Sequence, residues 1–212
     1  MKKIRIAVGL SGSGTTFESI ITACEQNQIE GEVVLVFSDK ADVKGLERAH
    51  SHKVPCILRC VPWKDWQGGW QLLQILQSSK VNLICLAGFL KLFPELIVRD
   101  FRHQIFNSHP ALDLQKFGGK GMYGHCVTEA VLQAGLKTTG STIHFVDEQY
   151  DHGAIILQNQ IEVLPDDTPG SLLERQIGPE REMYVEAIRL FQQGRLIVES
   201  NKVEILPERR ND

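Results

Sequence analysis

Two kinds of apolar pattern alternate through the first two thirds of the chain. Short, nearly continuous apolar runs are typical of strands that are covered on both faces of a sheet, and they predict strands at residues 4–10, 33–38, 54–58, 81–87 and 104–107. Longer segments repeat apolar residues every three or four positions, and they predict helices at residues 16–27, 44–52, 66–79, 94–100 and 125–133. Such alternation indicates βαβ units and a mostly parallel, doubly wound open sheet.

The pattern changes near residue 141. Strand-like segments at residues 141–146 and 154–158 flank a polar turn, which predicts a hairpin or a long bent antiparallel pair instead of another βαβ unit. A long helix is expected over residues 168–193, with a kink or break at Gly178 and Pro179 because proline cannot donate a helical hydrogen bond.

A short strand at residues 195–199 and a polar end complete the predicted order. The fold class is therefore α/β, a Rossmann-like open sheet with a C-terminal antiparallel strand pair and a long helix. We expect one domain over residues 1–200, followed by a polar tail over residues 201–212.

Composition narrows the class of protein without naming a reaction. Of the 212 residues, 42% are hydrophobic and 23% are charged, as in ordinary globular domains, and the formal net charge of -3 gives no basis for coating nucleic acid or an anionic membrane. No run of about 18 apolar residues predicts a transmembrane helix. The five cysteines form no CxxC pair, which favours a reducing, cytoplasmic location and argues against disulfides or a zinc site.

The first candidate site is the loop that follows the first strand, Leu-Ser-Gly-Ser-Gly-Thr-Thr at residues 10–16. Small residues between a buried strand and a helix let backbone N–H groups approach an anion, which indicates a phosphate-bearing ligand. Phe17 stands where a dinucleotide fingerprint requires glycine or alanine, although Asp39 keeps a dinucleotide alternative open. The loop could also simply cap a helix and bind nothing.

The second candidate site combines Asn107, His109 and Asp151. Asn107 and His109 stand at the carboxyl end of a predicted strand and face the same side of an extended chain, where they could stabilise an oxyanion and pass on a proton. Asp151 could orient a protonated His109, although it could equally be an ordinary turn residue. The other histidines show no metal-ligand spacing, so no metal is expected.

Five segments, taken together and in order, form a specific pattern over residues 4–199. They are SGSGT at 11–15, FSDKAD at 37–42, LAGFLKL at 86–92, NSHPAL at 107–112, and HFV, DHG and ILQ within 144–158. The chain in this respect resembles the formyltetrahydrofolate-dependent glycinamide ribonucleotide formyltransferases of purine synthesis. The resemblance implies their Rossmann-like fold, with 10-formyltetrahydrofolate as co-substrate and no metal.

The resemblance also implies roles for individual residues. Gly14, Thr15 and Thr16 would hold the substrate phosphate, Glu180 would lie near the ribonucleotide, and Asn107, His109 and Asp151 would act on the formyl group during direct attack by the glycinamide amine. Folate would lie along Leu90, Lys91, Leu92, Phe93 and Asn107 and along the turn of Asp147, Glu148, Gln149 and Tyr150. The partners are then small molecules, with no nucleic acid or membrane, and the protein is a monomer or a homodimer.

The chain departs from the usual pattern at Asp113, Leu114 and Gln115, where the family continues with Leu-Pro, and at Ser108, where isoleucine is common. Formyltetrahydrofolate hydrolases and methionyl-tRNA formyltransferases share the Asn, His and Asp set, but each usually carries a further domain for which 212 residues leave no room. A non-catalytic dinucleotide-binding module remains an alternative of a different class.

Overall fold

A computed structural model describes residues 3–58 and 66–208. The strands are β1 (Ile4–Leu10), β2 (Gly31–Ser38), β3 (Cys56–Leu58), β4 (Leu83–Leu86), β5 (Ile105–His109), β6 (Thr138–Phe145), β7 (Ile155–Glu162), β8 (Leu196–Glu199) and β9 (Lys202–Ile205). The helices are α1 (Thr15–Glu25), α2 (Lys44–Ser51), α3 (Trp66–Ser78), α4 (Glu95–Asp100), α5 (Leu114–Phe117), α6 (His125–Gln133) and α7 (Pro169–Gln192).

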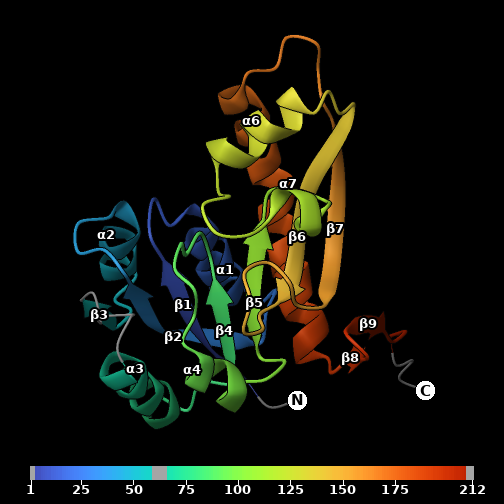
Figure 1. The fold of residues 1–212 in the computed structure, drawn as a ribbon. Helices are drawn as coiled ribbons and strands as arrows, with labels where there is room; N and C mark the ends of the chain where they lie inside the picture. The colour runs from blue at the N-terminus through green and yellow to red at the C-terminus, as the bar shows by residue number, and fades with distance from the viewer. Residues whose placement is uncertain (1–2, 59–65, 209–212) are drawn as a thin grey trace.

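The main sheet has seven strands in the order β3-β2-β1-β4-β5-β6-β7 (Figure 1). Strands β1 to β5 pair in parallel, whereas β6 pairs antiparallel with both β5 and β7. From β1 the sheet extends through β2 to β3 on one side, and through β4 and β5 to β7 on the other. The predicted doubly wound sheet with a late antiparallel pair is therefore confirmed, and its reversal point lies between β1 and β4.

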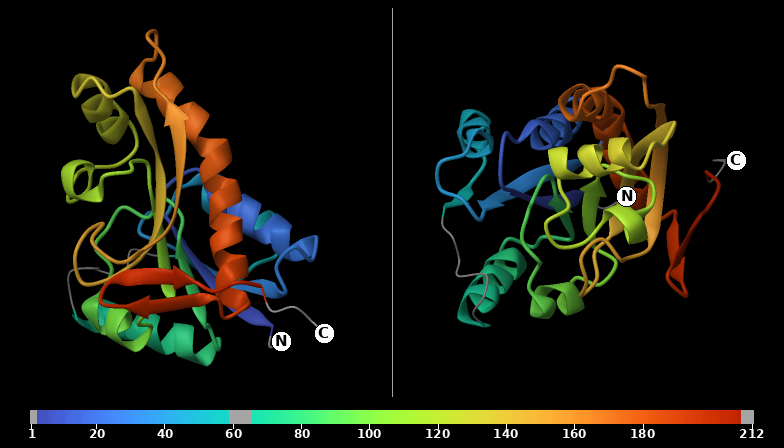
Figure 2. Two further views of the ribbon diagram at one scale, coloured as in Figure 1. Left: turned by 90° about the vertical axis from the view of Figure 1, so that its right-hand side faces the viewer. Right: turned by 45° about the horizontal axis from the view of Figure 1, so that its top comes forward.

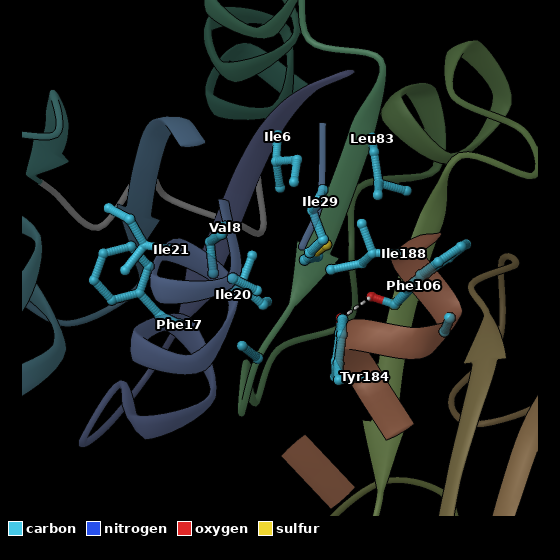
Figure 3. Packing of buried hydrophobic residues seen from close by; sticks show 14 of the residues in the cluster. Ile6, Val8, Phe17, Ile20, Ile21, Ile29, Leu83, Phe106, Tyr184 and Ile188 are labelled. Atoms are coloured by element: carbon cyan, nitrogen blue, oxygen red, sulfur yellow. Dashed lines mark hydrogen bonds between the residues drawn. The ribbon is translucent and has the colours of Figure 1, made fainter. Parts of the chain in front are cut away.

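Helices cover both faces of this sheet. One face packs residues of α1 and α7 against β1 and β4, as Figure 3 shows for Ile20, Ile188, Val8 and Leu83. The other face packs residues of α3 and α4 against β2, β4 and β5. The near-continuous apolar runs of the central strands follow directly from this double burial, because neither face of the strand can be polar.

Tyr184 ties α7 to strands β4 and β5 in this core. Its side chain is fully buried, and its hydroxyl donates to the carbonyl of Phe106 at 3.1 Å and lies 3.3 Å from that of Leu86 (Figure 3). A buried hydroxyl must find an acceptor, so these contacts fix the rotation of α7 about its axis. That rotation decides which α7 residues face the carboxyl ends of β4 and β5.

Helix α7 runs through Gly178 and Pro179 as one helix of 24 residues (Figure 2), so the predicted break is wrong. Thr168 and Ser171 form a capping box at its start, and buried residues on both sides of Pro179 pack against the sheet. This packing outweighs the hydrogen bond that the exposed proline cannot donate. None of the helices in the described parts of the chain is both long and apolar enough to cross a membrane.

Residues 202–205 also differ from expectation, because they form β9 where a polar tail was predicted. Strand β9 pairs antiparallel with β8 in a separate two-stranded sheet. Ser200 and Asn201 both have positive φ, at 49° and 59°, which is the backbone of a two-residue hairpin turn. Val198 and Val203 pack against the core, so burial holds the hairpin in place. Residues 209–212 of the predicted tail lie outside the described residues.

Candidate active site

A cavity of about 360 Å³ opens at the carboxyl ends of β1, β4 and β5. The strand order reverses between β1 and β4, so the loops that follow these strands diverge and leave a crevice between them. The walls come from the loop after β1, the segment after β4, the end of β5, the turn before β7 and one face of α7. Both sites that the sequence predicted separately therefore belong to one cavity.

The loop after β1 presents unpaired backbone donors to this cavity. Gly14 caps α1 with φ of 71°, a left-handed conformation that favours glycine, and Gly14, Thr15 and Thr16 all line the cavity. Within the described residues, no protein acceptor bonds the backbone N–H groups of residues 13–17. These donors stand at the positive end of the helix dipole, which is the arrangement that binds phosphate.

Asn107, His109 and Asp151 come together at the centre of the cavity wall, as the sequence predicted. Asn107 and His109 lie two residues apart on β5, and Asp151 reaches them from the turn between β6 and β7. The Asp151 Oδ2 atom lies 3.5 Å from His109 Nδ1, and Asp151 Oδ1 accepts a hydrogen bond of 3.3 Å from Asn107 Nδ2. One carboxylate therefore contacts both candidate catalytic side chains.

The His109 ring has an acceptor at each nitrogen. Its Nε2 atom donates to the carbonyl oxygen of Phe117 at 2.8 Å, while Nδ1 faces the Asp151 carboxylate. A carbonyl oxygen can only accept, so a neutral ring would place its bare Nδ1 against a negative oxygen. The ring is buried, so both of its nitrogens face protein oxygens and not solvent.

Asp151 is held as a carboxylate. Burial alone would raise its pKa, but bonds to His109 and His144 and a 2.9 Å bond from the Gly119 N–H together hold that pKa well below the usual value. Its backbone has φ of 49°, in the left-handed region, which turns the side chain back toward β5. The negative charge opposite His109 is therefore present throughout the neutral pH range.

His144 is the residue that the sequence analysis missed. Its Nδ1 atom donates to the carbonyl of Phe145 at 2.7 Å, and its Nε2 atom faces both Asn107 Nδ2 at 3.1 Å and Asp151 Oδ1 at 3.6 Å. Residues 107 and 144 are direct partners in the antiparallel pairing of β5 and β6. The sequence did contain one indication of this residue, because His144 begins the HFV segment in the strand predicted at residues 141–146. No group of three or more His, Cys, Asp or Glu side chains in the described residues is placed to hold a metal ion.

Glu180 projects from α7 into the cavity, one helical turn before Tyr184. Burial raises the pKa of its carboxyl group, and the hydroxyls of Ser108 and Ser141 partly offset that rise. The Ser141 hydroxyl lies 3.4 Å from Glu180 Oε2. The serine at position 108, where the family usually has isoleucine, therefore has a partner in this chain. Glu180 therefore lines the same cavity as the loop after β1 and His109.

The segment after β4 that the sequence predicted to contact folate lies along the cavity. Leu90, Lys91, Leu92 and Phe93 all contribute to the wall. The buried Ser11 hydroxyl accepts from the Leu90 N–H at 3.0 Å, so this segment is tied to the loop after β1. A second bond of 3.0 Å, from the Leu92 N–H to the Tyr150 hydroxyl, ties it to the turn before β7.

In that turn, Gln149 and Tyr150 line the cavity, whereas Asp147 and Glu148 do not. The Asp147 carboxylate instead accepts from the Gln149 N–H at 2.9 Å and bonds His152 at 2.6 Å. Asp147 shapes the turn that carries Gln149 and Tyr150. The structure thus brings two of the four predicted turn residues to the cavity.

The unusual segment at Asp113 forms the short helix α5. Asp113 caps it, because its carboxylate accepts from the Lys116 N–H at 3.0 Å. The end of α5 supplies the Phe117 carbonyl to His109, and Gly119 just beyond supplies its N–H to Asp151. A side chain at Gly118 would meet Leu114 O at 2.3 Å, so the chain can pass this point only as glycine. The departure from Leu-Pro is therefore compensated by a capped helical turn.

The chain is similar to known proteins in both sequence and structure. The sequence pattern of a family described as formyl transferase matches residues 4–188. The chain is 36% identical to the chloroplastic phosphoribosylglycinamide formyltransferase of Arabidopsis thaliana, covering 99% of this chain and 73% of that protein. It is also 36% identical to the phosphoribosylglycinamide formyltransferase of Haemophilus influenzae, covering 95% and 92%. The structure of glycinamide ribonucleotide transformylase 1 from Symbiobacterium toebii superposes with a TM-score of 0.89 at 38% identity, covering 97% and 95%.

Proposed function

The chain belongs to the formyl transferase family, and we propose that its Asn107, His109 and Asp151 transfer the formyl group of 10-formyltetrahydrofolate to the amine of glycinamide ribonucleotide. The chain is an enzyme of purine biosynthesis that formylates phosphoribosylglycinamide with a formyl-folate co-substrate. The observation that supports the residue assignment best is the buried His109 ring, which lies between the Asp151 carboxylate and the Phe117 carbonyl.

The proposed chemistry is direct attack of the amine on the formyl carbon. Negative charge then develops on the formyl oxygen, and preorganised donors stabilise it as it forms. The bond between the formyl carbon and the folate nitrogen then breaks. His109 gives its proton to that nitrogen as it leaves and takes up the proton that the attacking amine loses, and the Asp151 carboxylate keeps the ring oriented between these steps. No formyl group needs to bond to the enzyme.

Asn107 supplies a second donor in this scheme. Its Nδ2 group bonds His144 at 3.1 Å and Asp151 at 3.3 Å. The Asp151 bond is the longer one, and we infer that the amide exchanges it for the developing oxyanion. The His144 bond meanwhile keeps the amide oriented with its N–H groups toward the reacting centre. His144 is thus a positioning residue for Asn107.

The two substrates are positioned from opposite ends of the cavity. We infer that the N–H groups at Gly14, Thr15 and Thr16 hold the ribonucleotide phosphate and that Glu180 accepts hydrogen bonds from the same substrate. The folate lies along residues 90–93, with Gln149 and Tyr150 on the other side. Holding both reactants in one cavity converts a bimolecular reaction into an effectively unimolecular one, which accounts for much of the expected rate enhancement.

The remaining expectations concern partners and location. The net charge of -3 and the odd number of cysteines support a cytoplasmic enzyme that acts on small molecules and not on nucleic acid or membranes. We propose a monomer or a homodimer, which sedimentation at assay concentrations distinguishes directly.

The test is a folate absorbance assay with 10-formyltetrahydrofolate, run with and without glycinamide ribonucleotide. We expect release of tetrahydrofolate only when the ribonucleotide is present, with formylated ribonucleotide formed in equal amount. The matched control substrate is the glycinamide ribonucleoside, which lacks the phosphate and should show a much higher KM. Equal folate release without ribonucleotide would identify a hydrolase and overturn the proposal.

A further inference from the structure

We propose that Arg48, on the far side of the phosphate loop from the cavity, is a positioning residue that turns the backbone N–H groups of the loop toward the substrate phosphate. The inference rests on the proposed function, because it deepens the role assigned there to the loop. It assigns Arg48 no contact with substrate. Its effect would pass through the backbone of Ser13 and Gly14.

Two bonds from α2 hold successive carbonyl groups of the loop. The Gly45 N–H donates to the carbonyl of Gly12 at 3.0 Å, and the Arg48 Nε atom donates to the carbonyl of Ser13 at 3.0 Å. Figure 1 shows α2 beside the loop that joins β1 to α1. The two acceptors are consecutive, so α2 fixes the orientation of two adjoining peptide planes.

In a trans peptide the C=O and N–H bonds point in opposite directions. When α2 holds the Gly12 carbonyl, the N–H of Ser13 must point away from α2. In the same way, the bond from Arg48 to the Ser13 carbonyl turns the N–H of Gly14 away from α2. Ser13 and Gly14 line the cavity, whereas Gly45 and Arg48 do not, so the side opposite α2 is the cavity side. These two N–H groups are among the donors that have no protein acceptor in the described residues.

The close approach of α2 depends on two glycines. A Cβ atom at Gly14 would lie 2.4 Å from the Gly45 Cα atom, and a Cβ atom at Gly45 would lie 2.7 Å from Leu10 Cδ1. A side chain at Gly14 would meet the α2 backbone directly, and one at Gly45 would displace the buried Leu10 side chain and lie 3.1 Å from the Gly12 carbonyl oxygen. The glycine pair brings α2 close enough for Arg48, one helical turn beyond Gly45, to reach the Ser13 carbonyl.

The guanidinium group of Arg48 is itself oriented by α1. Its Nη1 atom donates to Glu18 Oε2 at 3.0 Å, and the other oxygen of Glu18 bonds His52 Nε2 at 3.1 Å. His52 in turn bonds Glu25 through Nδ1 at 2.8 Å. One planar group therefore donates in two directions, to the loop backbone and to α1. A lysine ammonium has a single nitrogen and cannot reproduce this fork.

Binding and activity measurements on Arg48→Ala and Arg48→Lys test the inference. Both variants should raise the KM for glycinamide ribonucleotide about tenfold or more, the scale of losing a charge-assisted hydrogen bond. The kcat at saturation and the KM for formyl-folate should change less than about twofold, since neither depends on the loop in this scheme. With the phosphate-free ribonucleoside, the variants should match the native enzyme. Arg99→Ala, which removes an exposed arginine paired with Glu95 on α4, is the control.

Three outcomes would overturn the inference. Native KM in Arg48→Lys would mean that only the positive charge matters. An equal loss with the phosphate-free ribonucleoside would mean that Arg48 does not act through the phosphate subsite. Loss of kcat together with a lower Tm, for all substrates, would mean a general structural role. Glu18→Gln keeps the Arg48 bond to Ser13 and should raise only the ribonucleotide KM, by less than Arg48→Ala does.

Titration with inorganic phosphate separates this inference from the proposed function. Phosphate should bind the native chain and the Arg99→Ala variant equally, and should bind both Arg48 variants about tenfold more weakly. This measurement needs no turnover. If formyl transfer to glycinamide ribonucleotide were absent while phosphate binding still depended on Arg48, the proposed function would fail and the positioning role would stand.

Discussion

His109 and Asp151 form a buried pair in which Asp151 Oδ2 lies 3.5 Å from His109 Nδ1. The other ring nitrogen of His109 is bound to the Phe117 carbonyl at 2.8 Å, so the imidazole cannot rotate without breaking a second bond. The pair is made by the long-range pairing of β5 with β6 and by the turn that follows β6. The geometry of the proposed proton donor therefore depends on segments more than 40 residues apart.

Replacing the carboxylate tests this pairing. Asp151→Asn should lower kcat by about 10² to 10⁴ at pH 7.5, because the neutral amide stabilises no imidazolium charge. The KM for glycinamide ribonucleotide should stay within a few-fold of native. Asp166→Asn is the matched control, since Asp166 is an exposed aspartate outside the cavity. A kcat equal to native in Asp151→Asn would remove Asp151 from the reaction.

The lowered pKa of Asp151 also predicts a pH dependence of stability. A carboxyl group whose pKa is lower in the folded state stabilises the fold above its unfolded pKa of about 3.9, and this contribution is lost as the pH falls toward the folded value. The difference in unfolding free energy between the native protein and Asp151→Asn should be constant from pH 7 to about pH 5 and then shrink. Urea titrations at several pH values measure it, and a difference that grows at acid pH would contradict the assignment.

Glu180 carries a pKa shift of the opposite sign. Because burial raises its pKa, ionisation of Glu180 costs folding free energy at neutral pH, and the cost disappears as the pH falls below about 4.3. Glu180→Gln should therefore raise Tm by a few degrees at pH 8, where roughly 2–4 °C corresponds to 1 kcal/mol, and by nothing near pH 4. It should also raise the ribonucleotide KM. Glu182→Gln, an exposed position on α7, should do neither.

The cap of α5 gives a prediction about Asp113. Asp113→Ala removes the acceptor for the Lys116 N–H, which costs about 1 kcal/mol of local stability. The end of α5 should then hold the Phe117 carbonyl and the Gly119 N–H less firmly, and kcat should fall by up to about tenfold. Asp113→Asn should retain most of the activity, since asparagine is also a good cap. Equal losses in both variants would show that the charge, and not the cap, matters.

The sequence predicted the sheet well, for a physical reason. The five parallel strands are buried on both faces, so their apolar runs stand out, and β1 was placed at residues 4–10 as observed. Strand β5 was predicted to end at residue 107 but continues through His109, because it pairs there with β6. A tertiary pairing of this kind leaves no local pattern.

The same reason explains what was missed at the site. His144 reaches Asn107 only because residues 107 and 144 are paired across two strands. The four-residue helix α5 depends on its cap and on two backbone bonds to His109 and Asp151, none of which produces an apolar period. The break predicted at Pro179 is wrong for the opposite reason. There a strong local signal, the proline, was outweighed by the packing of α7 on the sheet.

The central claim is that His109 acts in the chemical step after both substrates have bound. A single-turnover experiment with His109→Ala, at saturating glycinamide ribonucleotide and formyl-folate, measures that step directly. We expect the rate of formyl transfer to fall about 10² to 10⁴-fold, while the ribonucleotide dissociation constant stays within a few-fold of native. A transfer rate equal to that of the native enzyme in this variant would contradict the claim.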